Sequence, residues 1–346
     1  MSLGSVMLDI AGTSLSAEDR ELLRHPQVGG LILFARNYVD PAQLAALTAE
    51  VHALRSPALV IAVDQEGGRI QRFQTGFTRL PAARALGALY DQDPERGRRL
   101  ATEVSWLMAT ELKALGVDLS FAPVLDLDHG LSAVIGDRSF HRDPDAVIAL
   151  ARASMRGMSA AGMAAVGKHF PGHGAVALDS HHSLPIDGRD YADIALADLR
   201  PFAALAESGL AGVMPAHIVY PAVDDQPAGF SRRWLQGILR GELGFAGAIF
   251  SDDLEMAGAA VAGSHLDRAL AAQEAGCDML LVCNQRTAAI RVVEGLHSPP
   301  APASLARILR MRGHSGQRQG ADLNLAQRLA SVKAAVSLAF EAASST

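Results

Sequence analysis

Short apolar runs alternate with longer segments of helical periodicity along most of the chain, and this alternation restricts the possible folds more than any other feature. The apolar runs are, in order, SVMLDIA (5–11), GLILF (30–34), ALVIAVD (58–64), VDLSFAP (117–123), AAVGKHF (164–170), AGVMPAH (211–217), GAIFSD (247–252) and CDMLLVC (277–283). Between them, apolar residues recur at helical spacing in segments such as 41–54, 95–115, 144–161 and 191–208. This order is typical of parallel strands joined by crossover helices. Roughly eight such pairs predict an α/β fold, a single (β/α)8 TIM-like barrel.

No linker interrupts the series, so we expect residues 1–346 to form one barrel domain, with the residues after about 299 forming terminal helices. A hydrophobic content of 49% over 346 residues supplies enough apolar side chains for a large core. The polar, basic joint RMRGHSGQRQG (310–320) could bind an anion, but a solvated connection is the favoured interpretation.

Composition excludes several classes of partner. The apolar runs are too short to cross a bilayer, which takes about 20 residues, and the first 15 residues lack the pattern of an export signal. Cys277 and Cys283 are expected to be reduced core residues, so we predict a cytoplasmic protein. A net charge of −6 without a basic stripe, and only 5% aromatic residues, argue against nucleic acid. We therefore expect a small, neutral or mildly charged substrate. We also predict a monomer.

Polar residues stand where the predicted strands end. Asp64, Lys168, His169, His217 and Asp252 all lie at or just beyond the carboxyl end of an apolar run. In a barrel of parallel strands this end carries the active site.

The segment KHFPGHGAVALDSHHSL (168–184) combines four histidines with an aspartate after one of these strands. The connection is longer than the roughly 2–6 residues of an ordinary strand-to-helix loop, so it is a candidate lid. Asp179 and His181 are separated by one residue and can project to the same side. A carboxylate that accepts from one ring nitrogen makes the other nitrogen more basic, which predicts a general acid/base dyad.

Metal binding is the main competing interpretation of this segment. The possible ligands are His169, His173, Asp179, His181 and His182. No HExxH motif and no paired cysteine spacing accompanies them, so we predict neither a metal nor another cofactor, and His173 and His182 are interpreted as structural.

The motif SDDLEM (251–256) follows the apolar run GAIF and allows two interpretations. Asp252 could be a nucleophile that points into the barrel mouth. Alternatively, Asp252 or Asp253 could cap a helix, with Glu255 completing a capping box, and the dipeptide alone favours this second interpretation. One aspartate can also cap while the other reacts.

Two arginine-containing motifs supply candidate substrate contacts. VDQEGGRIQRF (63–73) places Asp64 at a strand end and Arg72 beyond a Gly-Gly turn, and VIGDRSF (134–140) contributes Arg138. Asp64 could accept hydrogen bonds from paired hydroxyls, and Arg72 could brace it or a substrate oxygen. A structural Asp–Arg pair and a loop arginine that donates to carbonyls are the competing interpretations. The glycine spacing does not fit a nucleotide-binding loop.

These motifs together resemble one known family. VDQEGGRIQRF, FAPVLDLD, GDRSF, KHFPGHG with DSHH, MPAHIVYP and SDDLEM, in this order and spacing, resemble the NagZ-type β-N-acetylglucosaminidases of glycoside hydrolase family 3. The resemblance covers about residues 8 to 284. KHFPGHG followed by DSH is its most specific part.

The resemblance implies a role for each matching residue. It implies that Asp252 is the nucleophile of a retaining glycosidase, that His181 is the general acid/base, and that Asp179 orients His181. The residues implied to hold the N-acetylglucosamine ring are Asp64, Arg72, Arg138, Lys168 and His169. The implied activity removes terminal β-linked N-acetylglucosamine from muropeptides during cell-wall recycling. A family 3 β-glucosidase, a phosphorylase-like member, a zinc-dependent hydrolase and a non-catalytic sugar-binding protein are the alternatives.

Overall fold

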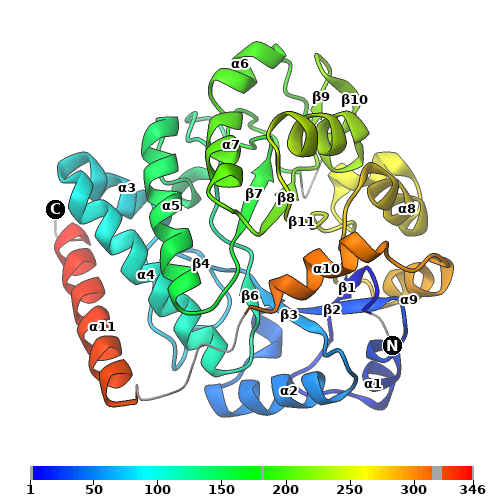
Figure 1. Cartoon of the computed structure of the whole chain (residues 1–346), viewed down its shortest axis with the longest axis horizontal. Coiled ribbons are helices and arrows are strands. Elements are labelled where there is room, and N and C mark those ends of the chain that lie inside the picture. Colours follow the sequence, from blue (N-terminus) through cyan, green and yellow to red (C-terminus); the bar gives the residue numbers. More distant parts are fainter. Residues whose placement is uncertain (1–2, 181–182, 314–321, 345–346) are drawn as a thin grey trace.

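The computed structural model describes residues 3–180, 183–313 and 322–344. Two parallel sheets form its centre, and helices surround them (Figure 1). The first sheet has the order β12 (Leu280–Val282), β1 (Val6–Leu8), β2 (Val28–Leu33), β3 (Val60–Val63) and β6 (Leu119–Ser120). The second has the order β11 (Ala248–Ile249), β8 (Gly212–Pro215) and β7 (Val166–Phe170). The predicted α/β alternation with parallel strands is therefore confirmed.

Single isolated bridges lie between the two sheets at both of their edges. Val124, just beyond β6, pairs in parallel with Lys168 of β7, and Phe250, just beyond β11, pairs in parallel with Met279, just before β12. Among the described residues the continuous ladders stop at these two places, so the strands form two sheets and not one uninterrupted ring. Two small antiparallel ladders lie outside them: β4 (Gln65–Gly67) with β5 (Ile70–Gln71), and β9 (Val219–Tyr220) with β10 (Asp224–Pro227).

Three of the long helices begin where the sequence places an aspartate before a proline. Asp40, Asp93 and Asp143 each precede a proline at the first turn, and each carboxylate accepts a hydrogen bond from a backbone N–H of that turn. Proline at the start of a helix loses no intrahelical bond, and the aspartate satisfies a free donor. The helices are α1 (Ala17–Leu23), α2 (Pro41–Ala53), α3 (Ala83–Gln92), α4 (Pro94–Ala114), α5 (Pro144–Ala160), α6 (Tyr191–Leu196), α7 (Leu199–Glu207), α8 (His265–Ala275), α9 (Arg286–Gly295), α10 (Pro302–Met311) and α11 (Asp322–Ser344). Shorter helical segments are η1 (Ala35–Asn37), η2 (Gly136–Arg138), η3 (Ala228–Phe230) and η5 (Ala257–Ala262), and η4 (Arg233–Glu242) is a π-helix.

One predicted helix is interrupted. The segment 191–208 forms α6 and α7 with a break at Ala197 and Asp198. The buried Asp198 carboxylate instead bonds Arg189 at 2.7 Å and His129 at 2.9 Å. Periodicity could not reveal this break, because it depends on partners from other parts of the chain.

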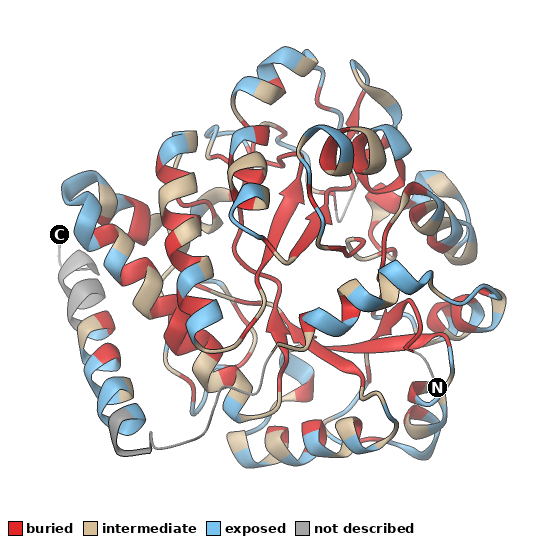
Figure 2. Cartoon of the chain, in the orientation of Figure 1, coloured by how far each residue is buried: buried red, intermediate tan, exposed pale blue. Residues whose placement is uncertain are grey.

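Burial follows the layers, with the strands at the centre and the outer helix faces exposed (Figure 2). Phe121 and Phe250, from the two sheets, meet edge to face with ring centroids 5.4 Å apart. The terminal helix α11 packs on α4, where Arg328 lies 3.9 Å above the Trp106 ring and Lys333 pairs with Glu111 at 2.8 Å. None of the described helices combines the length and the apolar character needed to span a membrane.

Candidate active site

A cavity of about 630 Å³ opens beyond the carboxyl ends of the strands. Every residue with a predicted catalytic or sugar-binding role except His181 lines it, namely Asp64, Arg72, Arg138, Lys168, His169, Asp179 and Asp252. His181 lies outside the described residues. The topology therefore brings together residues that are up to 188 positions apart in the sequence, from Asp64 to Asp252.

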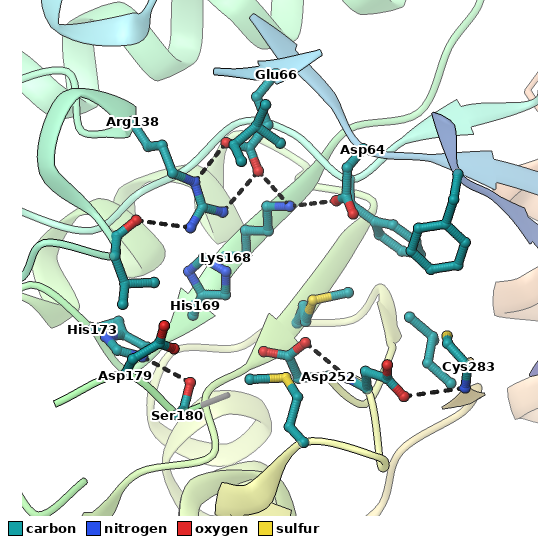
Figure 3. Close-up of a pocket in the computed structure, with 18 of the residues that line it drawn as sticks. Asp64, Glu66, Arg138, Lys168, His169, His173, Asp179, Ser180, Asp252 and Cys283 are labelled. Carbon is teal, nitrogen blue, oxygen red and sulfur yellow. Dashed lines mark hydrogen bonds and ion pairs between the residues drawn. The ribbon is translucent and has the colours of Figure 1, made fainter. Parts of the chain in front are cut away.

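Lys168 links two carboxylates on one wall of the cavity (Figure 3). Its Nζ lies 2.8 Å from Oδ1 of Asp64 and 2.7 Å from Oε1 of Glu66, and the residue is 2% exposed. Burial alone would lower the pKa of Lys168, but the two carboxylates outweigh it and raise the pKa above its ordinary value. Lys168 is therefore a fixed positive charge. Arg72 is a looser neighbour, with Nη2 3.7 Å from Oδ2 of Asp64.

Glu66 also holds Arg138 in a two-point ion pair. Arg138 donates from Nε to Oε2 and from Nη2 to Oε1, both at 2.8 Å, and from Nη1 to the carbonyl of Val134 at 3.2 Å. Burial alone would raise the pKa of Glu66, but Arg138 and Lys168 hold it far below its usual range. Arg138 therefore lines the cavity, and it also donates to a backbone carbonyl, as the alternative interpretation of a structural loop arginine predicted.

His169 is oriented by the buried carboxylate of Asp126. His169 Nδ1 donates to Asp126 Oδ2 at 2.6 Å, and the backbone N–H of His173 donates to Asp126 Oδ1 at 2.7 Å. Burial alone would raise the pKa of Asp126, but His169 and the hydrogen bonds lower it. Because the carboxylate fixes Nδ1–H, the other ring nitrogen of His169 is left for the cavity.

Asp252 and Asp253 differ in role although they are neighbours. Asp253 Oδ1 accepts from the backbone N–H groups of Glu255 and Cys283, both at 3.1 Å, so it holds the turn. Burial raises the pKa of Asp253 to about 7. Asp252 Oδ1 accepts from the Asp253 N–H at 2.8 Å, and Asp252 caps no helix. The predicted helix cap is wrong for both aspartates, because the next helical segment, η5, begins only after Met256. Asp253 instead stabilises a turn, and Asp252 faces the cavity.

The buried His217 contacts the same turn. Its Nε2 lies 3.2 Å from the carbonyl oxygen of Asp253, and its ring packs against Phe230. This residue of the motif MPAHIVYP is fully buried, so it supports the wall of the cavity and does not line it.

Comparison with protein families decides where this chain belongs. The model of the glycosyl hydrolase family 3 N terminal domain matches residues 3–311, which is most of the chain. The chain belongs to glycoside hydrolase family 3.

Similar proteins of family 3 indicate the type of glycoside hydrolase. The chain is 61% identical over 315 residues to the β-hexosaminidase of Thiobacillus denitrificans, covering 91% of this chain and 88% of that protein. It is 58% identical over 320 residues to the β-hexosaminidase of Thioalkalivibrio sulfidiphilus, covering 92% of each chain. The crystal structure of native NagZ from Neisseria gonorrhoeae superimposes with a TM-score of 0.93 at 47% identity, covering 98% of each chain. The predicted family 3 glycoside hydrolase of the β-N-acetylhexosaminidase type is therefore confirmed.

Glu66 is a further residue of the cavity in this family 3 enzyme, and it was not among the predicted site residues. Glu66 stands two positions after Asp64 and belongs to β4. Side chains two positions apart in extended backbone project to the same side, so the motif VDQEGG did contain a signal for it. The partner Arg138 is 72 residues away, which the motif could not reveal.

No group of three potential ligands among the described residues is arranged to hold a metal ion. The two described histidines of the segment 168–184 instead form hydrogen bonds to other residues: His169 to Asp126, and His173 to Ser180 at 3.1 Å. These bonds leave the described part of the cavity suited to acid, base and nucleophile chemistry on a polar substrate.

Proposed function

We propose that this family 3 enzyme is a retaining exo-β-N-acetylglucosaminidase. Its substrates would be (anhydro)muropeptides of peptidoglycan recycling, from which it removes the terminal non-reducing β-linked N-acetylglucosamine. The observation that carries the proposal is that Asp252 and Asp179 line one cavity together with the Asp64–Lys168 pair and His169.

In the first step, Oδ of Asp252 attacks the anomeric carbon C1. The C1–O bond to the aglycone breaks, and the departing oxygen takes a proton from His181, whose positive charge is stabilised by Asp179. The products are a glycosyl–aspartate ester and the free aglycone alcohol. Retaining glycosidases need one nucleophile and one proton donor, and a histidine here takes the second role.

In the second step, water attacks C1 from the face that the aglycone left. The neutral His181 accepts a proton from this water, and the bond between C1 and Asp252 breaks. Two displacements at C1 return the sugar with its original β configuration, and His181 is protonated again for the next cycle.

Polar residues on the cavity wall would bind the sugar. Asp64 accepts hydrogen bonds from hydroxyls, while Lys168, Arg72, Arg138 and His169 supply donors. A NagZ structure from Neisseria gonorrhoeae contains N-trifluoroacetyl-D-glucosamine, and that chain superimposes on this one with a TM-score of 0.92 at 47% identity. This similarity supports an amino-sugar ligand here.

We extend the proposal to the architecture and the setting of the enzyme. One closed (β/α)8 barrel domain, running from 1 to 346 with terminal helices after about 299, would explain the parallel bridges at both edges of the two sheets. Cys277 and Cys283 are buried free thiols, which suits a reducing cytoplasm. We propose that the enzyme acts as a monomer.

The deciding experiment is incubation with a fluorinated amino-sugar glycoside that traps the intermediate, followed by peptide mass spectrometry. The expected adduct is on Asp252, and the expected first product of turnover is the β anomer. An adduct on another residue, or an inverted product, refutes the mechanism. Parallel incubations with a GlcNAc-anhydromuramyl-peptide and with cellobiose, each with and without phosphate, separate this function from the β-glucosidase and phosphorylase alternatives.

A further inference from the structure

Ser180 stands between Asp179 and His181 in the sequence. It forms two hydrogen bonds, one through its side chain and one through its backbone. Its Oγ lies 3.1 Å from Nε2 of His173, and its carbonyl oxygen accepts the backbone N–H of Gly258 at 3.0 Å. Ser180 and His173 are both 2% exposed. Figure 3 shows the bond between them directly beside Asp179. A buried hydroxyl of this kind holds its segment more firmly than a solvated one would.

His173 is itself fixed to the sugar-binding side of the cavity. Its backbone N–H donates to the Asp126 carboxylate, which also accepts from Nδ1 of His169, and the rings of His169 and His173 meet edge to face at 5.8 Å. Burial lowers the pKa of His173, so its ring is neutral near pH 7. Ser180 is thus connected through His173 and Asp126 to a residue that faces the substrate.

Gly258 connects Ser180 to the nucleophile side. It follows SDDLEM by two positions and lies in η5. A Cβ at this position would stand 3.0 Å from Cβ of His217 and 3.3 Å from the carbonyl oxygen of Ser180. The two segments therefore approach so closely that a side chain at this position would force its neighbours to shift.

We propose that Ser180 is a positioning residue for acid/base catalysis. Its bonds to His173 and Gly258, which we call the Ser180 clasp, set the position of the adjoining Asp179 relative to Asp252 and to the sugar held by His169. This inference rests on the proposed function, because it presupposes that Asp179 and His181 transfer the proton. It predicts a defect in proton donation and not a general loss of structure.

The test compares the Ser180→Ala variant with the unaltered enzyme on aryl β-N-acetylglucosaminides whose leaving groups differ in acidity. One lost hydrogen bond corresponds to about a 3- to 10-fold loss of kcat for phenyl leaving groups. The loss should be smaller for 2,4-dinitrophenyl, whose departure needs little protonation. Ser180→Thr keeps the hydroxyl and should recover most of kcat. His173→Phe should reproduce the Ser180→Ala pattern, and the double variant should be no worse than either single variant.

Ser5→Ala is the matched control, because Ser5 is also 2% exposed and its hydroxyl has no hydrogen-bond partner among the described residues. Ser5 precedes β1, away from the cavity, so its loss should leave the leaving-group dependence unchanged. An equal loss of kcat by Ser180→Ala on all aryl substrates, or no loss at all, overturns the clasp. His181→Ala separates the two ideas: if it shows leaving-group dependence and Ser180→Ala does not, the clasp alone is wrong. If His181→Ala shows none, the proposed acid/base fails and the clasp fails with it.

Discussion

The guanidinium of Arg138 donates two hydrogen bonds to the carboxylate of Glu66, both with N–O distances of 2.8 Å. Neither side chain is more than 10% exposed. Lys168 adds a third contact to the same carboxylate at 2.7 Å. Glu66 therefore fixes two of the cations that face the substrate, although it was not among the predicted binding residues.

Glu66→Gln should destabilise the protein and weaken substrate binding. Breaking a buried ion pair costs on the order of 3 kcal/mol, because the remaining charges stay buried without their partner. We expect urea unfolding to show this decrease in the free energy of unfolding of Glu66→Gln, and steady-state kinetics to show a higher KM. Glu50→Gln is the control: its ion pair with Arg20 is 37–38% exposed, so its loss should cost less than about 1 kcal/mol. Equal effects of the two changes would contradict a structural role for Glu66.

Stability should fall in acid because of Glu66 and Asp126. Both carboxyls have a lower pKa in the folded protein than in the unfolded chain, so their contribution is complete above the unfolded pKa of about 4 and is lost as pH falls below it. Urea unfolding between pH 7 and pH 3 measures this dependence. The curve for Glu66→Gln should be shallower and should approach that of the unaltered protein at the acid end.

Asp253 should have the opposite dependence. Its folded pKa of about 7 lies above the unfolded value, so the folded state is favoured while the group is protonated, and this advantage is lost as pH rises from about 4 through 7. Asp253→Asn retains an oxygen that can accept from Glu255 and Cys283. It should raise the free energy of unfolding at pH 8 by up to about 4 kcal/mol, about three pKa units at roughly 1.4 kcal/mol each, and change it little at pH 4. A drop at pH 8 would show that the charged form is needed.

The fall in kcat that follows removal of the dyad should depend on the leaving group of the substrate. We expect His181→Ala to reduce kcat by about 10²–10⁴-fold on muropeptides, since general acid/base catalysis contributes that much, and far less on activated aryl glycosides. Asp179→Asn should show the same pattern with a smaller loss. Steady-state kinetics on both substrate classes measure it, and undiminished turnover of natural-type substrates by both variants would disprove the dyad.

Chelation should not affect activity. No metal-binding group was found among the described residues, and the reaction as proposed needs no metal. Dialysis against EDTA followed by an assay on an aryl N-acetylglucosaminide should give the kcat of the untreated enzyme. A loss that added zinc reverses would instead favour the zinc-dependent hydrolase.

The local sequence predicted much of this molecule correctly. Helices α2, α4 and α5 begin and end within one residue of the predicted segments, because capping aspartates, prolines and apolar spacing act over a few residues. Asp64, Lys168 and Asp252 were identified as cavity residues because strand ends can be recognised from the apolar runs that precede them.

The partners of these residues required the tertiary structure. Arg138 and Glu66 are 72 positions apart, Asp126 and His169 are 43 apart, and Asp198 breaks a regular helix pattern to meet His129 69 positions away. The raised pKa of Asp253 likewise comes mainly from burial, which a motif does not contain. Sequence patterns report interactions between neighbours along the chain. Ion pairing, desolvation and close backbone approach depend on distances that exist only after the chain has folded.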